Sequence, residues 1–228
     1  MARVLIVDDE PDMREMMAHQ LRSAGFTIEE AGSGAEALRR ARSAQPGAIL
    51  LDLLLPEMDG FEVFKALRRD PVTEAIPVLV VSARTSELDR VLAFELGADD
   101  YITKPFSPRE LVLRLRRSLD RHHPLPGPGT ERISVEELAI DLPGHRVLVE
   151  GEDIGVTATE FRLLRTLAER RGRVQSREAL LQEVWSAVSE DLDPRTVDTH
   201  IRRLRDKLGR ASRFIDTVRG VGYRMVTG

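Results

Sequence analysis

Short apolar runs and helical patterns alternate along the first half of the chain. The apolar runs lie near residues 3–7, 27–30, 47–51, 77–81 and 100–103. Apolar residues recur at helical spacing near 11–24, 34–44, 60–69, 86–96 and 108–121. Continuous apolar runs of this length are typical of strands buried on both faces. The pattern therefore predicts a five-stranded parallel α/β sheet with helices on both faces.

The pattern changes after a segment rich in proline and glycine, HHPLPGPGT (122–130), which predicts an interdomain linker. The stretches ISVEELAIDL and HRVLVEGEDI alternate as in a small antiparallel sheet, and helical periodicity follows at 158–170, 176–184 and 195–208. The final segment, FIDTVRGVGYRMV, predicts two strands around a glycine-containing turn. We therefore expect domains at 1–121 and 131–228, the second an α+β winged helix-turn-helix.

Composition narrows the class of protein. A length of 228 residues suffices for two domains, and 42% hydrophobic with 32% charged residues is typical of a globular protein. The lack of an apolar stretch near ~20 residues argues against a membrane span, and the early charges in MARVLIVDDE argue against a signal peptide. The absence of cysteine excludes disulfides and thiol catalysis and fits a cytoplasmic protein.

Charge is unevenly distributed behind a net value of −4. Residues 195–224 hold nine basic and three acidic side chains, whereas residues 131–160 hold two basic and eight acidic ones. Positive charge gathered at one end of one domain favours a polyanion as a partner, despite the overall acidity.

Chemically useful side chains follow four of the predicted strands. Asp8 and Asp9 end the first run, Asp52 the third, Ser82 the fourth and Lys104 the fifth. Each residue alone is more simply a turn, cap or surface residue. Because the carboxyl ends of parallel strands share one crevice, their joint occurrence predicts a site there. Clustered carboxylates suit Mg²⁺, Asp52 could attack a phosphoryl group, and Ser82 and Lys104 could hold the phosphoryl oxygens.

The predicted helix at 195–208 carries a buried stripe and a basic face. Val197, Ile201, Leu204 and Leu208 form the stripe. The face opposite the stripe consists of Arg195, Thr199, Arg202, Arg203 and Asp206, with His200 and Lys207 on one flank and Arg205 on the other. Because this helix would end a helix-turn-helix and precede a wing carrying Arg219, DNA recognition is favoured over a merely solvated face.

These motifs resemble a known family over nearly the whole chain. VDDE, LLDLLLPEMDG, VVSA and GADDYITKPF are similar to the receiver domain of bacterial two-component response regulators. TATEFRLL, SREALLQEVW, RTVDTHIRRLRDKL and TVRGVGYR resemble the effector domain of the OmpR/PhoB family. The resemblance implies a flavodoxin-like (βα)5 receiver followed by a winged-helix DNA-binding domain.

The resemblance also implies residue roles and partners. Asp52 would take a phosphoryl group from a sensor histidine kinase, with Mg²⁺ or Mn²⁺ held by Asp8, Asp9, Asp52 and the Leu54 carbonyl group. Ser82 and Lys104 would sense the phosphoryl group, and Tyr101 would be an aromatic switch that turns inward. The residues expected to contact DNA are Arg195, Thr196, Thr199, His200, Arg202, Arg203, Arg205, Thr217, Arg219 and Tyr223.

Phosphorylation would then drive formation of a homodimer on direct-repeat DNA half-sites, where RNA polymerase is a further expected partner. The dimer would form through residues of the last two receiver helices and the strand between them, namely Arg90, Asp99, Asp100, Glu110, Arg114 and Arg117. No membrane partner and no turnover of a separate substrate are expected.

Two alternatives stay open. A phosphatase or phosphotransferase would use Asp52 as a turnover nucleophile, but it would need a general acid at position 54, where this chain has Leu54. A regulator that binds DNA constitutively would not need the intact set of acids together with Ser82 and Lys104.

Overall fold

The computed structural model describes residues 2–122, 132–185 and 192–227. The chain forms two compact units, Met1–His122 and His123–Gly228. The predicted linker at 122–130 lies outside the described residues except for His122, which ends a helix.

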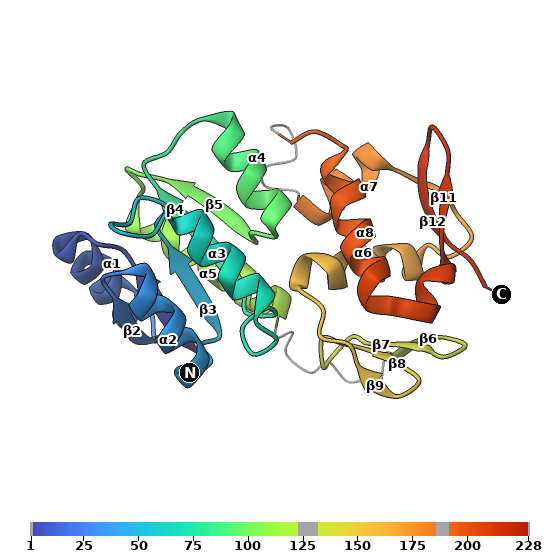
Figure 1. Cartoon of the computed structure of the whole chain (residues 1–228), viewed down its shortest axis with the longest axis horizontal. Helices are drawn as coiled ribbons and strands as arrows, with labels where there is room; N and C mark the ends of the chain where they lie inside the picture. The colour runs from blue at the N-terminus through green and yellow to red at the C-terminus, as the bar shows by residue number, and fades with distance from the viewer. Residues whose placement is uncertain (1, 123–131, 186–191, 228) are drawn as a thin grey trace. The chain divides into compact units, whose positions relative to one another are not determined.

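The first unit is a parallel sheet in the order β2-β1-β3-β4-β5 (Figure 1). Its strands are β1 (Arg3–Val7), β2 (Thr27–Ala31), β3 (Ala48–Leu51), β4 (Val78–Ser82) and β5 (Asp100–Thr103). The helices that alternate with them are α1 (Pro11–Ser23), α2 (Gly34–Ala44), α3 (Gly60–Arg69), α4 (Glu87–Leu96) and α5 (Pro108–His122). This order confirms the predicted flavodoxin-like (βα)5 fold.

The three central strands, β1, β3 and β4, are almost wholly apolar because both faces of the sheet are covered there. On one face Ile6, Leu50 and Val81 pack with residues of α1 and α5, including Leu21 and Leu115. The alternate strand residues are equally buried on the other face, where α2, α3 and α4 lie side by side (Figure 1). Side chains that follow the last strand residues are therefore held at one edge by a rigid core.

The second unit holds the predicted small sheet, three helices and terminal hairpin. Strands β6 (Arg132–Val135), β7 (Leu138–Asp141), β8 (Arg146–Val149) and β9 (Glu152–Asp153) form an antiparallel sheet. Helices α6 (Ala158–Glu169), α7 (Arg177–Trp185) and α8 (Thr196–Leu208) pack on one another. The short helix η2 (Gly209–Phe214) leads into β11 (Ile215–Val218) and β12 (Gly222–Met225), the two strands of the wing.

One strand of the second unit was not predicted. Strand β10 (Gln175–Ser176) pairs with Gly222 and Tyr223 of β12, so β12 is the central strand of a three-stranded sheet. Two residues are too few to leave an alternating pattern in the sequence. Within the described ranges, no helix is both long enough and apolar enough to cross a membrane.

Candidate phosphorylation site and nucleic-acid interface

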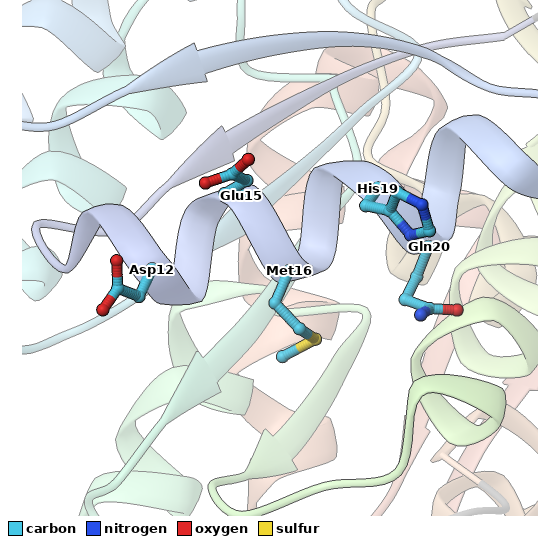
Figure 2. Close-up of a pocket in the computed structure, with 5 residues that line it drawn as sticks. All are labelled: Asp12, Glu15, Met16, His19 and Gln20. Atoms are coloured by element: carbon cyan, nitrogen blue, oxygen red, sulfur yellow. The ribbon is translucent and has the colours of Figure 1, made fainter.

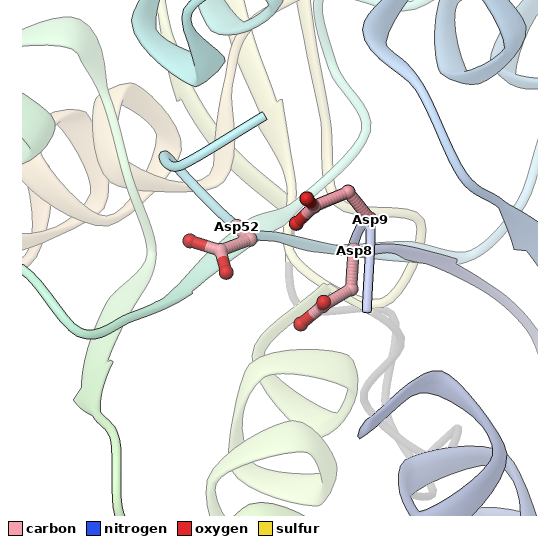
Figure 3. Close-up of side chains that lie close together, drawn as sticks. All are labelled: Asp8, Asp9 and Asp52. Carbon is pink, nitrogen blue, oxygen red and sulfur yellow. The ribbon is translucent and has the colours of Figure 1, made fainter. Parts of the chain in front are cut away.

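The carboxyl edge of the parallel sheet brings together the acids predicted from the sequence. Asp8 and Asp9 follow β1, and Asp52 follows β3, the neighbouring strand. Figure 3 shows their carboxylate groups clustered at this edge, where an oxygen from each lies within 4.8 Å of the others. Asp8 and Asp52 are buried, and Asp9 is exposed.

Both carboxylate oxygens of Asp52 are held by hydrogen-bond donors. Ser82 Oγ donates to Asp52 Oδ1 over 2.8 Å, and the amide of Leu54 donates to the same oxygen over 2.9 Å. Lys104 Nζ lies 2.5 Å from Asp52 Oδ2 and 2.6 Å from Asp8 Oδ2. The structure therefore gathers Asp8, Asp9, Asp52, Ser82 and Lys104 in one pocket around the side chain of Asp52.

The acidic pocket holds more carboxylate groups than positive charges. Burial raises the pKa of Asp8, and hydrogen bonds from Lys104 and the amide of Glu10 offset only part of that rise. Burial opposes the charge of Lys104, but its hydrogen bonds to Asp52 and Asp8 raise its pKa overall. One ammonium group cannot neutralise three carboxylates, so the pocket favours an added cation. A set of oxygen ligands fits a hard divalent cation such as Mg²⁺.

A glycine lets the next helix begin directly against Asp52. A Cβ atom on Gly60 would lie 2.4 Å from the carbonyl oxygen of Asp52 and 2.4 Å from the Cα of Leu53. Asp59 caps α3 by accepting a hydrogen bond from the amide of Phe61. Position 60 therefore requires glycine, because any other side chain would displace the backbone that carries the candidate phosphoacceptor.

Tyr101 lies inside the receiver although β5 is an edge strand. Its side chain is 5% exposed, and its hydroxyl donates to the carbonyl oxygen of Arg84 over 2.8 Å. Burial, reinforced by the charge of Asp89, raises the pKa of Tyr101 to about 12.

The raised pKa of Tyr101 predicts a loss of stability at alkaline pH. A group whose folded pKa is raised stabilises the fold below its unfolded value, near 10, and this contribution is lost as the pH rises toward 12. We expect wild type to lose up to about 2–3 kcal/mol more than Tyr101→Phe between these limits. Urea unfolding of both proteins across this range measures the difference. Parallel loss of stability in the two proteins would contradict this role of Tyr101.

The second candidate site is the outer face of α8 together with the wing. Arg195 and Arg202 are exposed, and Thr199 and Arg203 are partly exposed. Arg219 is exposed at the turn between β11 and β12. The structure therefore presents much of the predicted basic face on α8 and places Arg219 at the tip of the wing.

Three of the residues predicted to contact DNA are buried instead. His200 is 1% exposed, with its ring centroid 5.0 Å from that of Trp185, and Thr196 is 1% exposed. Tyr223 is 5% exposed, and its hydroxyl donates to Asp198 over 2.7 Å. These three side chains therefore do not belong to the exposed face of α8 and the wing.

Arg177 was not among the predicted residues, although it joins α7 to α8. Arg177 donates to Asp198 over 2.8 Å and lies 5.2 Å from the ring centroid of Tyr223. On the other flank, Arg205 donates to Thr217 Oγ1 over 2.8 Å. A lone arginine in a sequence gives no sign of such contacts.

The predicted dimer residues are partly engaged within their own chain. Asp100 is 3% exposed and pairs with Arg114 over 2.7 Å, and Arg114 also pairs with Glu110 over 3.0 Å. Asp99 is 8% exposed and accepts from the amide of Val78. Asp99 and Asp100 are therefore both largely inside the receiver, where their carboxylates already have partners in the same chain.

An open groove of about 400 Å³ lies along α1 (Figure 2). Asp12, Glu15, Met16, His19 and Gln20 line this groove. It shares no residue with the acidic pocket, and its size therefore says nothing about the chemistry at Asp52.

A parallel sheet with an acidic pocket, followed by a winged helix-turn-helix unit, is the arrangement of a DNA-binding response regulator. The family model for the response regulator receiver domain matches residues 4–116, and the model for the C-terminal part of transcriptional regulatory proteins matches residues 151–225. This chain belongs to the OmpR/PhoB family of response regulators.

Relatives match along almost their entire length. The DNA-binding response regulator MtrA of Mycolicibacterium smegmatis is 41% identical, with 97% of this chain and 96% of the relative covered. The phosphate regulon transcriptional regulatory protein PhoB of Escherichia coli is 43% identical, with coverage of 99% and 98%. The solved structure of the chemotaxis response regulator CheY4 of Vibrio cholerae is 37% identical, with a TM-score of 0.50, 52% of this chain covered and 98% of that chain covered.

Proposed function

We propose that this chain accepts a phosphoryl group on Asp52 from the phosphohistidine of a sensor histidine kinase and responds by binding double-stranded DNA to regulate transcription. One observation carries the proposal. The carboxylate of Asp52 is buried, yet Ser82 and Lys104 bind it directly beside Asp8 and Asp9. These are the groups that can hold a phosphoryl group once it is attached to Asp52.

The contacts of Asp52 define how its own side chain would react. One carboxylate oxygen attacks phosphorus as the bond from phosphorus to the kinase imidazole breaks, and the imidazole, which keeps the proton on its other ring nitrogen, leaves as a neutral group. Because both oxygens are already engaged, the attacking oxygen must release a donor. Ser82 and Lys104 then pass from the carboxylate to the phosphoryl oxygens, whose negative charge they stabilise.

Asp8, Asp9 and Asp52, with the carbonyl oxygen of Leu54, would hold Mg²⁺ or Mn²⁺. The bound cation supplies positive charge that lets a phosphoryl group approach the acids. Calorimetric titration with Mg²⁺ tests binding without measuring phosphorylation. We expect Asp9→Asn to weaken the titration, and an unchanged titration would remove Asp9 from the ligand set.

Labelling with acetyl phosphate followed by a DNA-shift assay tests the whole proposal against its alternatives. We expect stoichiometric phosphate on the protein and tighter DNA binding after labelling. Continuous release of phosphate from many turnovers would indicate a phosphatase or phosphotransferase. DNA binding of equal strength before and after labelling would indicate a constitutive binder.

The remaining parts of the proposal concern assembly and location. We assign residues 1–121 to the receiver, 122–130 to the linker and 131–228 to the effector. The phosphorylated chain forms a homodimer through α4, β5 and α5, and it occupies direct-repeat half-sites about 10–11 bp apart. RNA polymerase is a further partner. Since DNA is the ligand, the protein works in the cytoplasm, and it turns over no substrate apart from its own phosphoryl group.

A charge reversal on α5 tests the dimer face. Arg114→Glu should weaken the phosphorylated dimer by about 1–2 kcal/mol, because the reversed charge could not exchange ion pairs with a second copy and would repel its Glu110. Each exposed pair is worth about 0.2–1 kcal/mol, and a symmetric dimer repeats it. Sedimentation of the phosphorylated protein measures the effect. Arg116→Glu, the same change elsewhere on α5, is the control. Equal dimerisation of the two variants would exclude Arg114 from the interface.

A further inference from the structure

Arg84 connects the loop that follows Ser82 to two neighbouring helices. Its Nη2 atom lies 2.6 Å from Asp59 Oδ2, and its Nη1 atom lies 3.3 Å from Asp89 Oδ1. Asp59 is the N-terminal cap of α3, and Asp89 lies in the first turn of α4. The guanidinium group also lies 5.5 Å from the ring centroid of Phe61. One side chain therefore ties the β4–α4 loop to α3 and α4 together.

The backbone of Arg84 joins the same loop to Tyr101 and to the acidic pocket. Its carbonyl oxygen accepts the hydroxyl hydrogen bond of Tyr101 at 2.8 Å. Its amide approaches Ser82 Oγ at 3.4 Å, and that hydroxyl donates to Asp52. A continuous set of contacts therefore runs from Asp52 through Ser82 and Arg84 to Tyr101.

We propose that Arg84 is a positioning residue that couples phosphorylation of Asp52 to the arrangement of Tyr101 and α4. The guanidinium group holds the β4–α4 loop on Asp59 and Asp89, which keeps the carbonyl oxygen of Arg84 in place for the hydroxyl of Tyr101. The side chain of Arg84 donates to Asp59 and Asp89 and not to Asp52, so its role is to position the loop rather than to react. This proposal rests on the proposed function, since it assumes that α4 takes part in the dimer.

The two carboxylates explain why arginine suits this position. Its planar guanidinium can donate to Asp59 and Asp89 at once, whereas the ammonium group of lysine is a more compact charge. Arg84 is only 27% exposed, so water competes with these hydrogen bonds less than at an open surface. We therefore expect Arg84→Lys to restore part of the coupling and Arg84→Gln to lose it.

The test compares Arg84→Gln with Arg69→Gln in the full chain. Arg69 is exposed on α3, so its substitution gives the same change of charge away from the loop. We expect both variants to take up phosphate from acetyl phosphate. Mutations that disturb coupling between sites typically change it by a few-fold to some tens of fold, so Arg84→Gln should dimerise roughly 2- to 30-fold more weakly. Arg69→Gln should dimerise like wild type.

A spectroscopic readout separates positioning from a general loss of packing. The chain has only two tyrosines, so 3-fluorotyrosine labelling gives two ¹⁹F resonances, which Tyr101→Phe assigns. Arg84→Gln should shift the Tyr101 resonance and leave that of Tyr223 unchanged. Arg84→Lys should shift it less. Asp59→Asn and Asp89→Asn each remove one of the two ion pairs of Arg84 and should give intermediate shifts. They also test the positioning role if Arg84→Gln does not fold.

A double substitution supplies the decisive comparison. In the Tyr101→Phe background, Arg84→Gln should weaken dimerisation less than it does in the wild-type chain, because the hydroxyl is gone and only the contact with α4 is left to lose. Additive losses, or an unshifted Tyr101 resonance in Arg84→Gln, would overturn the proposal. Failure of the wild type to dimerise after phosphorylation would instead count against the proposed function, and the ¹⁹F spectra would still test the positioning role.

Discussion

Asp52→Asn should carry no alkali-labile phosphate after incubation with acetyl phosphate and Mg²⁺. The amide of asparagine is not a nucleophile like a carboxylate, and no other acid in the pocket is held by both Ser82 and Lys104. Asparagine keeps nearly the same volume, and Lys104 retains its contact with Asp8. Loss of labelling would therefore reflect chemistry rather than collapse of the site.

The controls for this experiment are acids outside the pocket. Asp12→Asn and Asp59→Asn should label like wild type, because neither residue belongs to the acidic cluster. Wild-type labelling of Asp52→Asn would refute the assignment. Sedimentation after the same treatment gives a second result, since Asp52→Asn should stay in its unphosphorylated assembly state.

Arg203→Ala should weaken specific DNA binding by about 1–3 kcal/mol and relax the preference at one base position. Arg203 lies on the face of α8 away from the buried Val197 and Leu204. Its planar guanidinium can donate two hydrogen bonds to the O6 and N7 atoms of guanine in the major groove. A base-specific effect of this kind distinguishes direct readout from simple attraction to phosphate.

Selection of binding sites from random DNA measures this effect, with other arginines as comparisons. Arg195→Ala and Arg202→Ala should weaken all sequences alike and reduce the salt dependence of binding, as expected for phosphate contacts. Arg219, exposed on the wing, should favour a narrow A/T-rich minor groove. If Arg202→Ala alters the selected motif while Arg203→Ala does not, the assignment of the base-reading arginine is wrong.

The acidic pocket was predictable because it depends on strand ends, which apolar runs mark well. Once the sheet is parallel, Asp8, Asp52 and Lys104 must reach one edge. The sequence did not reveal that Lys104 already bridges Asp8 and Asp52, since that contact depends on side-chain conformations. The contacts of Arg84 were equally unpredictable from the sequence, because its partners come from two other elements of the receiver.

The burial of His200 on α8 is marked by its spacing in the sequence. His200 follows Val197 by three residues and precedes Leu204 by four. These are the spacings that define the buried stripe, so His200 belongs to it on geometric grounds. Tyr223 gave no comparable signal, because its burial depends on Arg177 and Asp198, far away in the sequence.

The ion pairs of Arg114 affect how selectively the receiver binds a second copy of itself. Arg114 is already paired with Asp100 and Glu110 of its own chain. Association with a second copy would therefore exchange existing pairs instead of creating new ones, and added salt would screen both states alike. A foreign acidic surface would gain little from a cation that is already neutralised. Preference for a second copy over a different receiver at this face would thus come from the fit of opposing helices, with little electrostatic attraction at long range.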